Sequence, residues 1–397
     1  MKTALCFSAD FETTTDKEDC RVWAYALSNV ANPHDFRYGN SIQGFLEFCA
    51  NPKLNYTMYF FNLKFDGAFI IAELLKQGYT RIESPKERAD KTFTTLITDR
   101  GAFYAIEIFF EVTKHHTNKV KIIDAMKIFP NFSVERLAES FGLPISKLEL
   151  DYKVKREIGH QLTNEEIAYI RNDVEIVAWA LKAMFDKGLT RMTIASNAMN
   201  DFKSRCTNFK TLFPELDPNK DKNIRASYRG GFTYLNEIHA GKIRQSGVTL
   251  DVNSLYPSIM KFMPMPIGDP IEYEGEYQPD EVYPLYVQII TCVFEIKDGK
   301  IPCVQIKHSM NFMPNEYLKS SGGDFVTLTL TKPDLELFLE QYRIIGKIIY
   351  ERGWKFRSAN HIFDSYIDYW TEEKITAGKE GNKGKRQIAK LMLNSLY

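Results

Sequence analysis

The sequence lacks the features of a membrane-spanning, secreted or zinc-stabilised protein. None of its 397 residues lies in a run of about 18 uncharged apolar residues, the length that a spanning helix needs. Asp10 and Glu12 interrupt the apolar run that begins at Ala4, which argues against a signal peptide. The six cysteines lie far apart and form no Cys-x-x-Cys pair, so we expect a reduced, cytoplasmic protein without structural zinc.

The sequence also lacks an excess of charge of either sign. Lys plus Arg and Asp plus Glu each number 51, so any nucleic-acid site must come from local segregation of charge. Aromatic residues are abundant, with 21 Tyr and 28 Phe, and they serve either large cores or surfaces on which bases stack. The length and the 44% apolar composition indicate two or three globular domains.

Strand-like and helix-like segments alternate up to about Gly188, which predicts an α/β domain. The clearest helix begins at Thr163, because Thr163 and Glu166 have the spacing of a capping box and apolar residues then recur at steps of three and four. The other expected elements are strands at 4–9, 57–61, 93–97, 103–110 and 120–123 and a helix at 68–75.

The second half of the chain has a different pattern. We expect a strand at 248–252 that leads into a turn, and an irregular inserted segment at 262–284 because of its prolines. Helices are expected at 334–340 and 360–374. Basic residues are in excess after residue 374, and the sequence stops inside a helix-like pattern, which favours a truncated chain.

Three elements of the first domain each carry acidic residues. Asp10 and Glu12 lie two apart at the end of a predicted strand, so their side chains project from one face. Asp66 follows the next strand at a strand-to-helix junction, and Tyr169 and Asp173 lie four apart on the capped helix. Each acid alone also fits an ordinary solvated residue, but their order and spacing favour a shared site.

Acids gathered in this way predict a magnesium site. Mg²⁺ prefers oxygen ligands, and several carboxylates are needed to hold two ions about 3.5–4 Å apart. One ion would generate hydroxide from water while the other stabilises a leaving 3′ oxygen. A tyrosine one turn before the last aspartate can position the attacking water.

These motifs resemble those of a known family. Asp10-Phe11-Glu12-Thr13, Asn62-x-x-Phe65-Asp66 and Tyr169-x-x-x-Asp173 resemble the three motifs of proofreading 3′–5′ exonuclease domains of the DnaQ-like, ribonuclease H-like type. From Asp10 to Tyr397 the sequence resembles the protein-primed family B DNA polymerases of small tailed phages, which replicate viral DNA. The resemblance implies an α/β exonuclease domain followed by an incomplete α+β palm, an insertion and partial helical fingers.

The resemblance also implies roles for residues of the exonuclease domain. Asp10, Glu12, Asp66 and Asp173 would hold the metals, and Tyr169 would orient the water. The residues expected to grip the single-stranded 3′ end are Thr13, Asn62, Phe65, Lys147 and Tyr152. The chain departs from the family at Ala125-Met126, where a Ser or Thr followed by Leu is expected, so one DNA-gripping hydroxyl is absent.

Two further motifs imply a polymerase site. Tyr228-Arg229-Gly230-Gly231 resembles the motif that joins the exonuclease and polymerase domains, and implies template binding, although the bare pattern also fits a turn with a basic residue. Asp251-Val252-Asn253-Ser254-Leu255-Tyr256-Pro257 resembles motif A. Asp251 would bridge the polymerase metals, and Ser254, Leu255 and Tyr256 would bind the incoming nucleotide, with Tyr256 excluding a 2′-hydroxyl.

The tail resembles motif B and implies nucleotide binding by Arg386, Lys390, Asn394 and Tyr397. The family's Tyr-x-Asp-Thr-Asp-Ser hairpin, which supplies the second metal carboxylate, and its thumb have no counterpart in the sequence. We therefore expect a complete exonuclease site in a chain that alone polymerises poorly or not at all. Either the sequence is a fragment, or the gene is split and a second chain completes the palm and thumb.

The resemblance further implies domains, cofactors and partners. The expected domains are the exonuclease at 1–189, the first half of the palm at 190–261, an insertion that contacts the terminal protein at 262–357, and partial fingers at 358–397. Mg²⁺ is the expected ion, with Mn²⁺ as a substitute. The expected partners are a single-stranded 3′ end, primer–template DNA, dNTPs and the terminal protein primer, in the cytoplasm of an infected host cell and without a membrane.

Two other functions stay open. A free-standing 3′–5′ exonuclease would need only the acids before Gly188, so Asp251 would be dispensable. A decayed polymerase kept as a non-catalytic single-stranded DNA-binding module is the non-enzymatic alternative. Retention of all four acids stands against it, because binding alone does not need carboxylates that face phosphate.

Overall fold

The structure is a computed structural model that describes residues 5–16, 18–146, 148, 150–151, 154–243, 245–306 and 316–397. Lys147 and Tyr152, two of the predicted DNA-gripping residues, lie outside these residues. The chain divides into two compact units, which are described in turn. The first runs to Phe202 and includes Tyr366–Tyr397, and the second is Lys203–Ser365.

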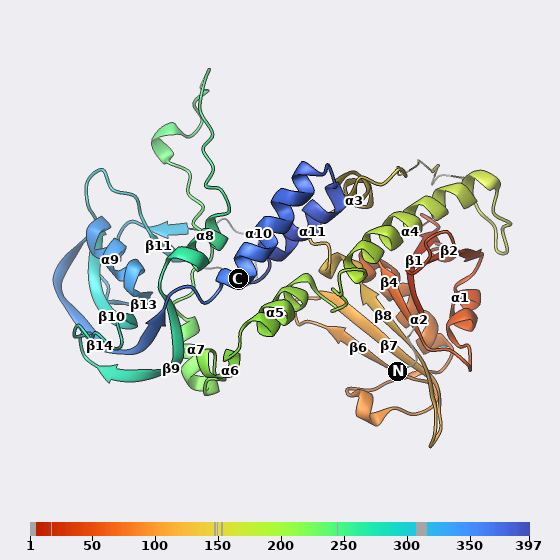
Figure 1. The fold of residues 1–397 in the computed structure, drawn as a ribbon, viewed down its shortest axis with the longest axis horizontal. Helices are drawn as coiled ribbons and strands as arrows, with labels where there is room; N and C mark the ends of the chain where they lie inside the picture. Colours follow the sequence, from red (N-terminus) through yellow and green to blue (C-terminus); the bar gives the residue numbers. More distant parts are fainter. Residues whose placement is uncertain are drawn as a thin grey trace. The chain divides into compact units, whose positions relative to one another are not determined.

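An eight-stranded sheet forms the centre of the first unit (Figure 1). Its strands are β1 (Leu5–Thr13), β2 (Val22–Asn29), β3 (Phe36–Gly39), β4 (Tyr56–Phe60), β5 (Thr80–Arg81), β6 (Thr92–Ile97), β7 (Phe103–Val112) and β8 (Thr117–Asp124). They lie in the order β3-β2-β1-β4-β8-β7-β6-β5. The central strand β4 is parallel to β1 and to β8, whereas β2 and β7 are antiparallel to their neighbours. The mixed sheet and its β6–β7 hairpin agree with the predicted α/β domain.

The two faces of this sheet have different partners. Phe7, Ala9 and Phe11 of β1 belong to a core that includes helices α1 (Ile42–Cys49) and α2 (Leu63–Lys76). Because side chains alternate along a strand, Ser8, Asp10 and Glu12 occupy the opposite face. The helix beside that face is α4 (Asn164–Phe185), which contacts β1 and β2 (Figure 1). The acids of β1 therefore face α4.

Helix α4 begins as the sequence predicts. The Thr163 hydroxyl accepts from the Glu166 backbone N–H at 3.2 Å, and the Glu166 carboxylate accepts from the Thr163 N–H at 2.9 Å. The apolar stripe is buried, but so are Tyr169 and Asp173, with exposed fractions of 2% and 4%. Helix α4 is thus buried over a wider face than its apolar stripe alone indicates.

Further helices complete the first unit. They are α3 (Val134–Phe141), α5 (Ile194–Arg205), α10 (Asp364–Lys379) and α11 (Lys383–Leu393), with short 3-10 turns at Pro85–Glu87 and Ala125–Lys127. Helix α11 contacts α3 and α4. The Trp370 indole N–H donates to Asp201 Oδ2 at 2.8 Å, and the Tyr366 hydroxyl donates to the Met392 carbonyl at 2.7 Å. The C-terminal helices are therefore held by specific hydrogen bonds within the unit that carries the acids.

The second unit is built on a four-stranded antiparallel sheet with the order β13-β10-β14-β9. Its strands are β9 (Met265–Glu274), β10 (Leu285–Ile296), β13 (Val326–Thr331) and β14 (Tyr342–Ala359), with a separate pair β11 (Val304–Ile306) and β12 (Glu316–Leu318). Helix α9 (Lys332–Gln341) packs on the sheet through Phe338, which meets Phe294 and Tyr342. Shorter helices are α6 (Phe209–Leu212), α7 (Pro218–Arg225), the 3-10 turn Glu237–His239 and α8 (Leu255–Phe262).

Two sequence-based expectations about the second unit are wrong. Residues 262–284 are not irregular throughout, because 265–274 form strand β9, whose prolines are tolerated at the edge of the sheet. Residues 248–252 form no strand, and Val248, Leu250 and Val252 are exposed. No strand among the described residues pairs with this segment, and an unpaired strand leaves its backbone hydrogen bonds unmade.

Among the described residues, no helix combines the length and the apolar character that crossing a bilayer requires.

Candidate metal centre and nucleic-acid interface

Three of the four predicted metal ligands lie together. Asp10 and Glu12 extend from β1 and Asp173 from α4, and one carboxylate oxygen of each lies within 4.8 Å of the others. Glu12 and Asp173 are buried, and Asp10 is partly buried. A cavity of about 140 Å³ lies beside Asp10 and Asp173. Spacing of this kind lets several carboxylates share one divalent cation or a pair of them.

Asp66 joins this group from the first turn of α2. Burial raises the pKa of the Asp66 carboxyl well above its usual range, and the negative charge of Asp10 raises it further. Hydrogen bonds from the backbone N–H groups of Asp66 and Phe11 oppose this rise, and Glu12 adds to it. The charges of both acids on β1 therefore raise the pKa of Asp66, which lies on α2.

The residues present fit a divalent cation. Asp66 Oδ1 is buried and has no hydrogen-bond partner among the described residues. Four clustered carboxylates repel one another, and burial makes this repulsion stronger unless protons or cations compensate it. An all-oxygen donor set is the one that Mg²⁺ and Mn²⁺ prefer.

Tyr169 and Thr13 flank the acids. Tyr169 lies one helical turn before Asp173 and packs in a small cluster with Ala26, Ile170 and Val174. Thr13 is the last residue of β1 and follows a shift in the β1–β2 register after Glu12. Both therefore lie on the elements that carry the acids.

The start of α2 presents two exposed side chains. Asn62 is exposed, and its backbone is left-handed, with a φ of 72°. Phe65 is 50% exposed, and its ring meets that of Phe69 at 5.5 Å between centroids. An exposed aromatic ring and an amide close to an acidic cluster suit the stacking and hydrogen bonding of a nucleotide base.

Sequence reasoning missed Asp124. Its Oδ1 accepts from the backbone N–H groups of Asn62 at 3.2 Å, Leu63 at 3.4 Å and Met126 at 3.1 Å. Its Oδ2 pairs with the Lys127 ammonium at 3.2 Å. A signal existed in the sequence, because an acid at the end of a buried strand beside a strand-to-helix junction needs partners. Ala125, the departure from the family pattern, is fully buried.

Motif A begins in an exposed segment of the second unit. Asp251 is exposed and lies in no strand. Ser254 has a left-handed backbone, with a φ of 51°, and precedes α8, whose first two residues are Leu255 and Tyr256. A Cβ added to Gly231 would lie 3.9 Å from the Tyr256 hydroxyl. Gly231, in the motif that resembles the one joining the two domains, thus lies close to the predicted nucleotide-binding tyrosine.

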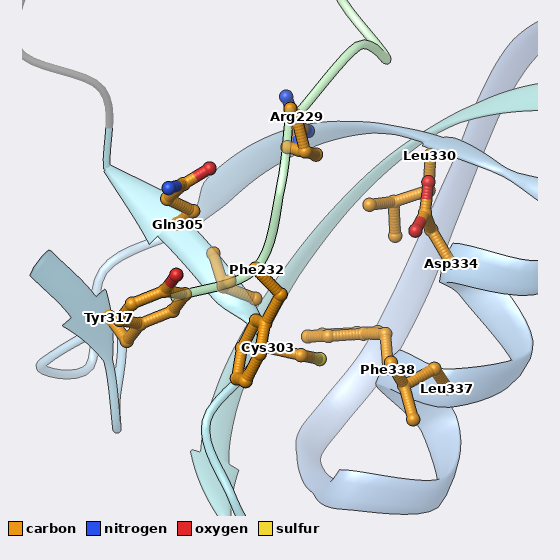
Figure 2. Close-up of a pocket in the computed structure, with 11 residues that line it drawn as sticks. Arg229, Phe232, Cys303, Gln305, Tyr317, Leu330, Asp334, Leu337 and Phe338 are labelled. Atoms are coloured by element: carbon orange, nitrogen blue, oxygen red, sulfur yellow. The ribbon is translucent and has the colours of Figure 1, made fainter. Parts of the chain in front are cut away.

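Arg229 is anchored beside a cavity of about 160 Å³ (Figure 2). Its two terminal nitrogens donate to the carbonyls of Ala226 and Thr329, both at 2.8 Å. Burial lowers the pKa of the guanidinium, and the charge of Asp334 opposes that shift. The Arg229 guanidinium therefore holds residues 226–229 to β13. The neighbouring Tyr228 side chain is exposed.

The motif B residues belong to the first unit, whereas Asp251 belongs to the second. Arg386 and Lys390 are exposed and lie four apart on α11. Asn394 caps the C-terminal end of this helix, and Tyr397 is exposed. The two cations therefore share one solvent-facing side of a helix.

Comparison with known proteins identifies the family. The sequence pattern of the family described as DNA polymerase type B, organellar and viral, matches residues 50–161 and 153–397. The DNA polymerase of Bacillus phage Nf is 44% identical over 393 residues, which cover 98% of this chain and 67% of that protein. The chain belongs to this family of type B DNA polymerases. The resemblance to the phage polymerases of family B is thereby confirmed.

Solved structures agree with the sequence relatives. A crystal structure of phi29 DNA polymerase matches with a TM-score of 0.93 and 42% identity, covering 99% of this chain and 67% of that one. A phi29 DNA polymerase complexed with primer–template DNA matches with a TM-score of 0.92 and 41% identity, with the same coverage. This type B polymerase chain spans about two thirds of the length of these relatives.

Proposed function

We propose that the chain carries a complete 3′–5′ exonuclease site of a protein-primed viral DNA polymerase. The observation that supports it is the meeting of Asp10, Glu12 and Asp173 within 4.8 Å. Asp66 is buried, and the charges of Asp10 and Glu12 raise its pKa. The proposed domains keep the expected limits, with the exonuclease at 1–189, palm at 190–261, insertion at 262–357 and fingers at 358–397. The proposed place of action is the cytoplasm of an infected host cell.

The four acids would hold one or two Mg²⁺ or Mn²⁺ ions. Such ions, when bound, supply an activated water and neutralise charge on the leaving 3′ oxygen. The Tyr169 hydroxyl would orient the water from the turn before Asp173. Thr13, Asn62 and Phe65 would hold the single-stranded 3′ end, with the Phe65 ring against a base. Lys147 and Tyr152 are proposed to contact the same strand.

A single-stranded oligonucleotide tests this proposal. With Mg²⁺, a 5′-labelled strand should shorten one nucleotide at a time, and a 3′-labelled strand should release its label first. The Asp10→Ala/Glu12→Ala variant should lose this activity, whereas Asp99→Asn, an exposed acid in the β6–β7 turn, should keep it. Shortening that persists in the double variant would assign the nuclease to a contaminant or to another site.

We also propose that the polymerase site is only partly present. Asp251 would bridge its metals, and residues 254–256 with Arg386, Lys390, Asn394 and Tyr397 would bind the dNTP. The sequence shows no counterpart of the family's second metal carboxylate, so these 397 residues alone should extend a primer weakly or not at all. Tyr228, Arg229, Gly230 and Gly231 are proposed to contact the template.

Substitution of Asp251 distinguishes a partial polymerase site from a free-standing exonuclease. When dNTPs are added, binding of the correct next nucleotide should slow shortening of a primer–template end, because a partial palm still competes for that end. The Asp251→Ala variant should lose this slowing and keep the shortening rate without dNTPs. An Asp251→Ala variant that matches the wild type with and without dNTPs would favour the free-standing exonuclease.

The insertion is proposed to contact the terminal protein that serves as primer. Support comes from the resemblance and from a sheet with its own core of Ile290, Phe294, Phe338 and Tyr342. We expect the terminal protein from the same phage to co-purify with the whole chain. This co-purification should be lost when residues 262–357 are replaced by a short linker. Retention after the replacement would place the contact elsewhere.

A further inference from the structure

The buried carboxylate of Asp124 contacts the proposed exonuclease site but is not one of the predicted metal ligands. It is 3% exposed and lies at the end of β8, where it pairs with Phe60 at the end of β4 in a parallel register. The chain leaves β4 at this point and enters α2 through Asn62. Asp124 is therefore beside the junction from which Asn62, Phe65 and Asp66 extend.

Asp124 supplies the cap that α2 does not supply for itself. Asn62 occupies the N-cap position, but its side chain makes no capping hydrogen bond. The neighbouring strand provides the acceptor instead, because Asp124 Oδ1 receives the N–H groups of Asn62 and Leu63. A carboxylate there also complements the positive end of the helix.

This arrangement leaves the Asn62 amide available to a ligand. A residue that caps its own helix uses its side-chain oxygen on the backbone. Asn62 instead has an exposed side chain and a left-handed backbone that is unfavourable for most residues. Its N–H bond to Asp124 opposes relaxation of that backbone, and the same bond fixes the direction in which α2 starts.

We propose that Asp124 is the positioning residue of the exonuclease site, which acts by holding the first turn of α2 so that Asn62 and Asp66 face the acids of β1. This inference rests on the proposed exonuclease function. Asp124 Oδ1 also binds the N–H of Met126, and Oδ2 pairs with Lys127, so the carboxylate is itself fixed by the turn after β8. Its three backbone contacts are all to Oδ1, so an amide oxygen can replace it.

Two substitutions separate positioning from charge. The Asp124→Ala variant should lower kcat/KM for single-stranded DNA by about 10–100-fold, because displacing a ligand by about 1 Å has effects of this size. The Asp124→Asn variant keeps an acceptor and should stay within about threefold of the wild type. Lys127→Met, which removes the ion pair but not the acceptor, should also stay near the wild type, and Asp99→Ala is the matched control.

Titration with Mn²⁺, followed by electron paramagnetic resonance, measures metal affinity and so tests the position of the acids without catalysis. Asp124→Ala should weaken Mn²⁺ binding, Asp124→Asn should not, and Asp10→Ala/Glu12→Ala should abolish it. Wild-type Mn²⁺ affinity and activity in Asp124→Ala would overturn the inference. Equal losses in Asp124→Ala and Asp124→Asn would also overturn it, since the acceptor would then not be the cause.

The two readouts distinguish this inference from the proposed function. A wild-type chain that binds Mn²⁺ but does not shorten DNA would contradict the exonuclease, while the Mn²⁺ affinities of the Asp124 variants would still decide the positioning. If Asp124→Ala does not fold, the Asp124→Asn and Lys127→Met variants test the positioning role instead. Both keep the Oδ1 acceptor, so a tenfold loss of Mn²⁺ affinity in both folded variants would contradict a role limited to that acceptor.

Discussion

Glu166 holds three partners and thereby fixes the start of α4. Its carboxylate accepts from the Arg156 guanidinium and from His160, both at 2.8 Å, in addition to the Thr163 N–H. Arg156 is buried and lies over the Trp23 ring at 4.2 Å. Burial alone would raise the pKa of Glu166, but the bonds from Thr163, His160 and Arg156 outweigh it and lower the pKa to about 2.

Glu166→Gln should destabilise the protein by about 2–4 kcal/mol at pH 7, because it leaves buried Arg156 without a counter-charge. The Glu166 carboxyl has a lowered pKa in the folded state, so its contribution is present above pH 4.5 and is lost as the pH falls towards about 2. Urea unfolding at pH 7 and pH 3 should therefore show a smaller difference between the variant and the wild type at pH 3. Glu165→Gln, an exposed neighbour, is the control, and a pH-independent difference would contradict the assignment.

Residue chemistry explains which parts of the site could be predicted. Spacing in the sequence was enough to predict Asp10, Glu12 and Asp173 as site residues, because strand and helix periods determine which side chains share a face. Asp124 could not be identified in this way, since its bonds to the start of α2 go to the backbone N–H groups of Asn62 and Leu63, which follow another strand. The anchoring of Arg229 to Thr329 depends on pairing 100 residues apart in sequence, which no local pattern contains.

At the scale of secondary structure, local signals succeeded where an element carries its own pattern. The capping box of α4 and the strands β6 and β7 are such cases. Strand β9 was missed because Pro266 and Pro270 argue against a strand, yet β9 lies at the sheet edge, where missing N–H donors are tolerated. The expected strand at 248–252 failed for the opposite reason, since its apolar pattern is present but no partner strand among the described residues pairs with it.

The attachment of α10 to the first unit gives a prediction for an element. The Trp370 indole donates to Asp201 of α5, so Trp370→Phe and Asp201→Ala should each destabilise the protein by about 1–3 kcal/mol. In a double-mutant cycle measured by urea unfolding, the two losses should overlap by about 1 kcal/mol. Strictly additive losses would show that the hydrogen bond does not contribute to stability.

For the whole molecule, the predicted functions are divided between the two units. The four acids of the proposed exonuclease site and the two cations of motif B belong to the first unit, and Asp251 and Arg229 belong to the second. The resemblance anticipated the family, and the comparisons confirm it. The roles of individual residues stay predictions, because family membership alone does not show which side chains perform the chemistry.

Limited trypsin digestion tests whether the segment before α8 in the second unit is the most accessible part of the chain. The described residues between the 3-10 turn ending at His239 and α8 form no helix or strand, and Lys242 there is exposed beside fully accessible Ile243. Proteases cut such backbone first, so the earliest fragments should be residues 1–242 and 243–397. Mass spectrometry identifies them, and Lys242→Gln should abolish the cut after residue 242, because trypsin cleaves only after Lys or Arg. A first cut within either sheet would contradict this description.

The most direct test of the central claim is one gel with a 5′-labelled primer–template and Mg²⁺, run with and without dNTPs. The purified chain should shorten the primer in the absence of dNTPs, and Asp10→Ala/Glu12→Ala should abolish this. With dNTPs the primer should not lengthen beyond its starting size. A primer that stays intact with the wild-type chain would contradict a complete exonuclease site, and one that lengthens would show that another carboxylate serves the polymerase site beside Asp251.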